Sequence, residues 1–82
     1  MNECVINPDW TFKEIVSHIE VIKSRAREII ASFSYFERKK AIAFMYKLRK
    51  DIYSLNFETW RCDRIVEYIY DDIDLQTLQK LI

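Results

Sequence analysis

Histidine and cysteine, which are well suited to acid–base and nucleophilic chemistry near neutral pH, are scarce in this sequence of 82 residues. His18 is the only histidine, and Cys4 and Cys62 are the only cysteines. No constellation joins a nucleophile, a base and an orienting group around His18, so we expect a packing or surface histidine. The two cysteines form no CxxC pair, and one histidine is too few to complete a zinc site. We therefore predict a protein that is not an enzyme and that needs no metal ion or cofactor.

Glycine is absent from the chain, whereas ordinary usage of about 7% would supply about six glycines. Phosphate-binding loops, dinucleotide-binding turns and the calcium loop of EF-hands all require glycine, so these classes of site are excluded. Asp71, Asp72 and Asp74 could bind a divalent cation, but carboxylates also favour the start of a helix. We expect these three residues to cap a short C-terminal helix.

The N-terminal residues and the lengths of the apolar stretches indicate where in the cell the protein is located. Residues 1–9 lack a basic start followed by an apolar run, and no apolar stretch approaches the roughly 20 residues that cross a bilayer. We therefore expect a cytoplasmic protein in which Cys4 and Cys62 are reduced. A disulfide between them is left open by the sequence.

Apolar residues recur three and four positions apart through most of the chain, which predicts helices. Thr11 with Glu14 and Ser34 with Glu37 have the form of capping boxes that open the first two helices. Asn56 is expected to end the second helix in the left-handed conformation, or to cap the third. The expected helices span about residues 12–32, 35–55, 58–70 and 75–81. The predicted fold is all-α, a compact single domain over residues 1–82 with three main helices and a short C-terminal one.

Two of these helices carry a second stripe of large side chains besides the one that forms the core. In the second helix this stripe holds Tyr35, Ile42, Tyr46 and Tyr53; in the third it holds Phe57, Trp60, Arg64 and Tyr68. The second helix could be central and packed on two sides, or one stripe could bind a partner, because Tyr, Trp and Arg are enriched at interface hot spots. Steps of four residues would also allow cation–π stacking between Arg64 and its aromatic neighbours. We predict partner-binding anchors at Tyr46, Tyr53, Trp60, Arg64 and Tyr68, with Lys47 and Lys50 as an electrostatic rim.

The net charge is zero, yet the charges are unevenly placed. Residues 23–50 hold nine basic and two acidic side chains, and the segments on either side are acidic. The acidic ends could fold back and neutralise the middle, or the middle could form a basic face. Nucleic-acid binding through segment 23–50 is one alternative function, which zero net charge disfavours. Its side chains would be Lys39, Lys40, Lys47 and Lys50. Peripheral attachment of the second helix to a membrane surface is another.

The whole chain also resembles a known family. Its length, its glycine-free composition rich in Ile, Tyr and Lys, the opening from Met1 through Phe12 and the tract from Phe57 to Tyr70 resemble the cytoplasmic accessory antiholins of T-even bacteriophages. No short motif carries the resemblance, so no functional residue is carried over from it. The resemblance implies a regulatory protein of the host cytoplasm that binds the cytosolic part of a membrane holin and delays lysis, alongside a separate periplasmic antiholin.

The prediction is therefore a small regulatory protein that acts by protein–protein interaction. We expect it to form a homodimer or another homo-oligomer, because a domain of this size often completes its core by association. Any contact with a membrane would be peripheral or would pass through the protein partner.

Overall fold

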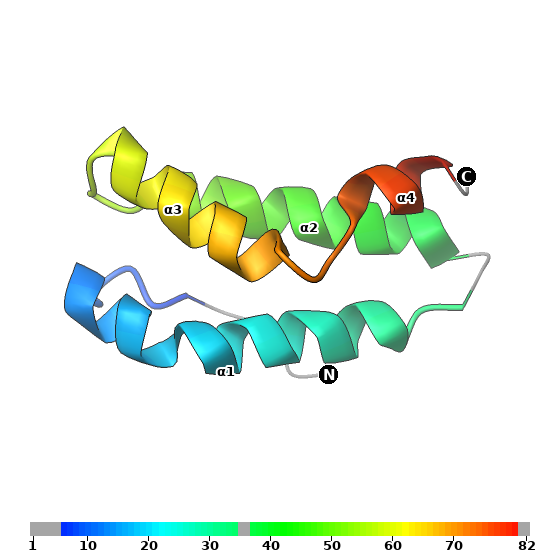
Figure 1. The fold of residues 1–82 in the computed structure, drawn as a ribbon, viewed down its shortest axis with the longest axis horizontal. Helices are drawn as coiled ribbons and strands as arrows, with labels where there is room; N and C mark the ends of the chain where they lie inside the picture. The colour runs from blue at the N-terminus through cyan, green and yellow to red at the C-terminus, as the bar shows by residue number, and fades with distance from the viewer. Residues whose placement is uncertain (1–5, 35–36, 81–82) are drawn as a thin grey trace.

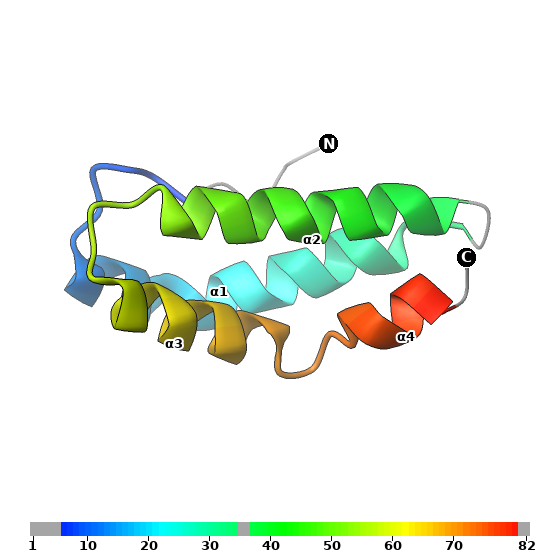
Figure 2. The same ribbon diagram turned by 90° about the horizontal axis from the view of Figure 1, so that it is seen from above.

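The computed structural model describes residues 6–34 and 37–80, which hold four helices. α1 and α2 run in opposite directions as a helical hairpin, and α3 and α4 follow one another along α2 (Figure 1 and Figure 2). The helix bounds are α1 Phe12–Ala31, α2 Arg38–Tyr53, α3 Thr59–Tyr70 and α4 Leu75–Lys80. α2 packs against each of the other three helices. The described ranges contain no strand, so the prediction of a compact all-α domain is confirmed.

α1 begins where the capping pair predicted it. The hydroxyl oxygen of Thr11 accepts the backbone N–H of Glu14 at 3.2 Å, and the same hydroxyl donates to the Glu14 carboxylate. This bond satisfies one of the amide groups that lack a partner in the first turn of a helix. α1 ends at Ala31, one residue before the expected end, and the Ser32 hydroxyl donates to the carbonyl of Ile29 at 2.6 Å.

The start of α2 differs from the expected helix over 35–55. Residues 35 and 36 lie outside the described residues, and the helix begins at Arg38. Only half of the predicted capping box is present in the structure. The backbone N–H of Ser34 donates to the carboxylate of Glu37 at 3.2 Å, whereas Glu37 itself occupies the cap position and makes no side-chain cap bond.

The end of α2 corrects a prediction. The helix ends at Tyr53, because the Ser54 hydroxyl donates to the carbonyl of Asp51 at 2.7 Å and Leu55 then turns into the core. The expectation that Asn56 adopts the left-handed conformation is wrong, since none of the described residues has a positive φ. Asn56 does not cap α3 either, because the cap residue of α3 is Glu58.

The start of α4 confirms the capping prediction for Asp74 alone, because Asp71 ends α3 and Asp72 pairs with Lys23 of α1. One carboxylate oxygen of Asp74 accepts the backbone N–H of Thr77 at 3.0 Å, and the other accepts the Thr77 hydroxyl. These bonds hold the pKa of Asp74 below its usual value. α4 therefore has the side-chain cap that a six-residue helix needs to form.

The core lies between the facing stripes of α1, α2 and α3 and continues under α4. Ile15, Met45, Ile52 and Ile69 have no exposed surface. Other buried side chains from the predicted stripes are Ile22, Ala26, Ile29, Ala41, Leu48, Leu55, Cys62, Ile65 and Leu78. Three buried residues come from outside the helices: Ile6 before α1, Leu55 between α2 and α3, and Ile73 between α3 and α4. The connecting segments thus contribute side chains to the core.

The segment before α1 is held in place by a stack of two rings. The Trp10 and His18 rings lie 4.8 Å apart between centroids and are inclined by only 17°. Asn7 forms the preceding turn, because its side chain accepts the Asp9 N–H and its carbonyl accepts the Trp10 N–H. His18 is exposed, so it acts as a surface packing residue, as the sequence predicted.

Tyr70 joins the end of α3 to the middle of α2. Its hydroxyl donates to the backbone carbonyl of Met45, and burial raises the pKa of Tyr70 to about 12. We predict that Tyr70→Phe lowers the free energy of unfolding by about 1 kcal/mol at neutral pH. Because the folded-state pKa is raised from 10.0 to about 12, this stabilisation is present below pH 10.0 and is lost as the pH rises through 12.

Urea unfolding followed by tryptophan fluorescence at neutral and alkaline pH measures both effects. The difference between wild type and Tyr70→Phe should shrink across that alkaline window. An equal difference at every pH would show that the hydroxyl does not stabilise the fold through this bond.

Candidate functional site

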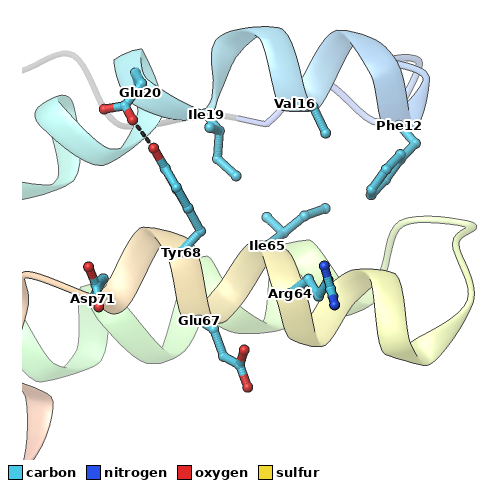
Figure 3. Close-up of a pocket in the computed structure, with 9 residues that line it drawn as sticks. All are labelled: Phe12, Val16, Ile19, Glu20, Arg64, Ile65, Glu67, Tyr68 and Asp71. Carbon is cyan, nitrogen blue, oxygen red and sulfur yellow. Dashed lines mark hydrogen bonds between the residues drawn. The ribbon is translucent and has the colours of Figure 1, made fainter.

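A groove runs along the surface between α1 and α3 (Figure 3). Its volume is about 750 Å³. It is lined by Phe12, Val16, Ile19 and Glu20 from α1 and by Arg64, Ile65, Glu67, Tyr68 and Asp71 from α3. We call this feature the α1/α3 groove. Two of the predicted partner-binding anchors, Arg64 and Tyr68, belong to it.

The floor of the α1/α3 groove is apolar. Val16 and Ile19 of α1 point toward Ile65 of α3 in Figure 3, and Phe12 closes one end. Val16 is 48% exposed and Tyr68 is 42% exposed, although both lie beside the buried core. Apolar surface left open between two helices gains free energy when a second apolar surface covers it. The groove therefore has the shape and chemistry of a docking surface.

Charged side chains surround this floor. Glu20, Glu67 and Asp71 contribute three carboxylates, and Arg64 contributes one guanidinium. Glu20 accepts a hydrogen bond from the hydroxyl of Tyr68, which ties α1 to α3 across the groove (Figure 3). The surroundings of the apolar floor are therefore negative on balance, which favours a partner with basic side chains.

The exposed Trp60 stands on α3 one helical turn before Arg64 and is not part of the groove lining. Trp60 is 54% exposed, and its indole N–H donates to Glu58 at 2.9 Å. The cation over its ring is Arg61, whose guanidinium lies 5.2 Å from the Trp60 centroid and 5.0 Å from that of Phe12. The cation–π contact expected from Arg64 is thus made by Arg61, because Arg61 lies on the α1 side of α3 and reaches both rings. Arg61 thus lies close to both the exposed Trp60 ring and Phe12 at the edge of the groove.

An ion pair between the buried Lys23 and the exposed Asp72 lies beside the Tyr68 end of the groove. Lys23 of α1 is only 7% exposed, and its ammonium lies 3.1 Å from the carboxylate of Asp72 and 4.8 Å from the centroid of the Tyr68 ring. Arg27 also pairs with Asp72. Hydrogen bonding and the charge of Lys23, aided by Arg27, hold the pKa of Asp72 below its usual value. The Tyr68 ring is therefore fixed between Lys23 and Glu20.

The remaining predicted anchors lie on α2, away from the groove. Tyr46 is 47% exposed and its hydroxyl oxygen accepts a hydrogen bond from Gln79 of α4. Tyr53 is 37% exposed and donates to Asp63 of α3, which raises the pKa of Tyr53. The predicted rim residues Lys47 and Lys50 are exposed on the same helix. The predicted anchor set is thus divided between two surfaces, the groove and the outside of α2.

The basic segment 23–50 does not form one face either. Lys23 and Arg27 pair with Asp72 from the acidic C-terminal part, and Lys40 pairs with Glu37 at 3.2 Å. The acidic end thus neutralises part of the basic middle, as one of the two sequence interpretations expected. The lysines expected to form a nucleic-acid interface are all on α2, where Lys39, Lys47 and Lys50 are exposed, and that function stays a prediction from the sequence.

Other chemistry-bearing residues have structural surroundings. Cys62 is a free, buried thiol that donates to the carbonyl of Ile52 at 3.5 Å, and burial raises the pKa of this thiol. Cys4 lies outside the described residues. Within residues 6–34 and 37–80, no three His, Cys, Asp or Glu side chains gather as they would around a metal ion. No helix in the same ranges combines the length and apolar character needed to cross a membrane.

Sequence reasoning missed the contribution of α1 to the groove. The spacing of Phe12, Val16 and Ile19 places them on the apolar stripe of the first helix and so predicts the core for them, and the sequence does not single out Glu20. The width of that stripe was the available signal, since Val16 stands one residue after Ile15 and is turned about 100° from it. Ile15 is completely buried and Val16 is 48% exposed, so the stripe includes both the core and the edge of the groove.

The pairing of Lys23 with Asp72 yields a prediction for acid pH. Because the folded-state pKa of Asp72 is lowered from 3.8, its stabilisation is present above pH 3.8 and is lost as the pH falls through the folded value. Asp72→Asn should lower the free energy of unfolding at neutral pH and weaken its dependence on acid. Unfolding in urea, followed by circular dichroism from neutral to acid pH, measures both changes.

Asp71→Asn is the matched control, because Asp71 is an exposed carboxylate next in sequence. Its stability should follow that of the wild type across the pH range. If Asp71→Asn and Asp72→Asn change the free energy of unfolding equally at every pH, the pairing of Asp72 with Lys23 does not stabilise the fold.

Comparison with known proteins gives no relative for this chain. A scan against protein-family models found no matching family, and neither the curated proteins nor the solved structures include a match. The groove and its charges are therefore the observations on which a function can be proposed.

Proposed function

We propose that this chain is a small, non-enzymatic regulatory protein that binds a protein partner in the α1/α3 groove. The observation that carries the proposal is a groove lined by two exposed large side chains, Val16 at 48% and Tyr68 at 42%, with Trp60, 54% exposed, on the same helix as Tyr68. Tryptophan and tyrosine contribute strongly to binding because they bury a large area and lose little conformational entropy.

The dimensions of the groove suit a short amphipathic helix. The stretch of α1 from Phe12 to Glu20 covers about 12 Å at 1.5 Å per residue, which corresponds to about two helical turns of a ligand. A helix of that length presents apolar side chains three and four positions apart to such a floor. Basic side chains flanking its apolar stripe would face Glu20, Glu67 and Asp71.

The resemblance to the accessory antiholins of T-even phages supplies a specific partner for this proposal. In that case the ligand is the cytosolic part of a holin, the location is the host cytoplasm, and the consequence of binding is delayed lysis. The partner would approach the groove from the cytosolic side of the membrane. Self-association into a homodimer or larger oligomer stays a prediction from the sequence.

We predict that Val16→Asp weakens partner binding by about tenfold or more, because it places a charge on the apolar floor of the groove and adds to its negative charge. The probe is the purified cytosolic segment of a T-even phage holin, titrated into the chain in a calorimeter. Tyr68→Ala should weaken binding in the same way, since it removes the largest side chain of the floor.

Val21→Asp is the matched control. Val21 is on the same helix and is 54% exposed, but it does not line the groove. Its affinity for the segment should stay within about twofold of the wild-type value. Equal weakening by Val16→Asp and Val21→Asp would contradict the groove assignment, and absence of binding by the wild-type chain would contradict the holin assignment.

A further inference from the structure

The outer face of α2 is strongly basic. The helix holds six basic side chains and a single acidic one, Asp51, among its 16 residues. At about 100° per residue, its buried stripe of Ala41, Met45, Leu48 and Ile52 leaves one line of residues pointing away from the core. This line consists of Lys39, Ala43, Tyr46, Lys47 and Lys50, all of which are exposed. We call it the α2 crest.

The α2 crest is straight, and at 1.5 Å per residue it extends over about 16 Å from Lys39 to Lys50. The acidic residues nearest to the crest, Glu37, Asp51 and Asp63, lie on either side of it and not on the crest itself. On the α1 side, Glu37 pairs with Lys40 and Asp51 is half-buried. On the α3 side, Asp63 accepts the hydroxyl of Tyr53. Positive charge is therefore concentrated along the top of the helix, with carboxylates on both sides.

This arrangement fits a flat anionic surface better than a nucleic-acid groove. A helix seated in a groove has phosphates along both flanks, where they would approach Asp51 and Asp63. A plane laid on the crest meets Lys39, Lys47 and Lys50, which are exposed, whereas Asp51 is half-buried beside them. Lysine ammonium groups near an anionic leaflet gain electrostatic free energy without requiring a fixed geometry.

Tyr46 adds an amphipathic ring to the crest. It is 47% exposed, and its hydroxyl oxygen accepts a hydrogen bond from Gln79 at the edge of α4. This bond holds the ring along the helix instead of projecting it as a platform for stacked bases. A tyrosine ring that lies level with lysine side chains is typical of the boundary between lipid headgroups and water.

We propose that the α2 crest binds the anionic headgroups of a phospholipid bilayer. The proposal does not depend on the proposed function, because the crest and the α1/α3 groove are on different sides of the molecule. α2 lies along one edge of the bundle and α3 along the other in Figure 2, and the groove opens between α1 and α3 in Figure 3. A chain that rests on a membrane through the crest thus keeps its groove and the acidic groups there away from the lipid.

Vesicle flotation tests this proposal. The purified chain is mixed with vesicles of phosphatidylglycerol and phosphatidylcholine, or of phosphatidylcholine alone, at low and at physiological salt. We expect binding to the anionic vesicles only, with an affinity that falls as salt rises because the Debye length shortens from about 30 Å at 0.01 M to about 8 Å at 0.15 M. Failure to float with anionic vesicles at low salt would overturn the proposal.

A triple variant, Lys39→Gln with Lys47→Gln and Lys50→Gln, tests the surface itself. We expect it to bind anionic vesicles at least about tenfold more weakly. The matched control is a second triple variant that also removes three positive charges, but from exposed residues outside α2. Its substitutions are Lys13→Gln, Arg25→Gln and Lys80→Gln. Its affinity should change by no more than about twofold. Equal loss in the two triple variants would show that general charge attraction, and not the crest, accounts for binding.

Competition with duplex DNA tests whether these lysines bind nucleic acid instead of anionic lipid. We expect DNA at a phosphate concentration equal to that of the anionic lipid to leave the vesicle-bound fraction unchanged. Displacement of the chain from the vesicles by DNA, together with a loss of DNA binding in the crest variant, would assign the surface to nucleic acid and overturn the lipid proposal.

Discussion

The buried ammonium group of Lys23 requires an opposite charge beside it, and the contacts around this group connect several parts of the structure. It is the buried charged side chain of the described residues, and a charge removed from water is tolerated only beside an opposite charge. Asp72 supplies that charge from the turn between α3 and α4, a site far away in the sequence. The pairing therefore holds the turn against α1 and acts together with the core contacts that pack α3 on α1 and α4 on α2. The ring of Tyr68, which covers the ammonium, forms one end of the groove.

The same pairing organises the charges of the whole chain. Lys23 and Arg27 are taken from the basic middle of the sequence and meet the acidic C-terminal part at Asp72. The lysines of α2 then remain as the exposed basic surface, whereas carboxylates of α1 and α3 surround the groove. A chain with zero net charge thus displays two surfaces of opposite sign. Each surface selects a different kind of ligand, which balanced composition alone would not suggest.

The parts of this fold that depend on neighbouring residues could be predicted from the sequence. Periodic apolar residues gave the four helices, and Thr11 and Asp74 cap the helices that they were expected to cap. Contacts between distant segments could not be predicted, because periodicity identifies a face of a helix but not the helix that covers it. Burial of Ile6, Lys23 and Ile73 belongs to this class. So does the division of the predicted anchors, since Tyr46 and Tyr68 lie on exposed faces of different helices.

The backbone of the described residues never adopts a positive φ, and this matches a chain without glycine. Its turns use right-handed and extended conformations, so every residue can carry a side chain without strain. The consequence concerns the unfolded state, because each glycine replaced by a residue with a Cβ removes conformations there and stabilises the fold by about 0.4–1 kcal/mol. The unfolded ensemble of this chain is therefore narrower than that of an average sequence of equal length. The chain therefore loses less conformational entropy when it folds, and a small helical core is sufficient to stabilise one arrangement of the helices.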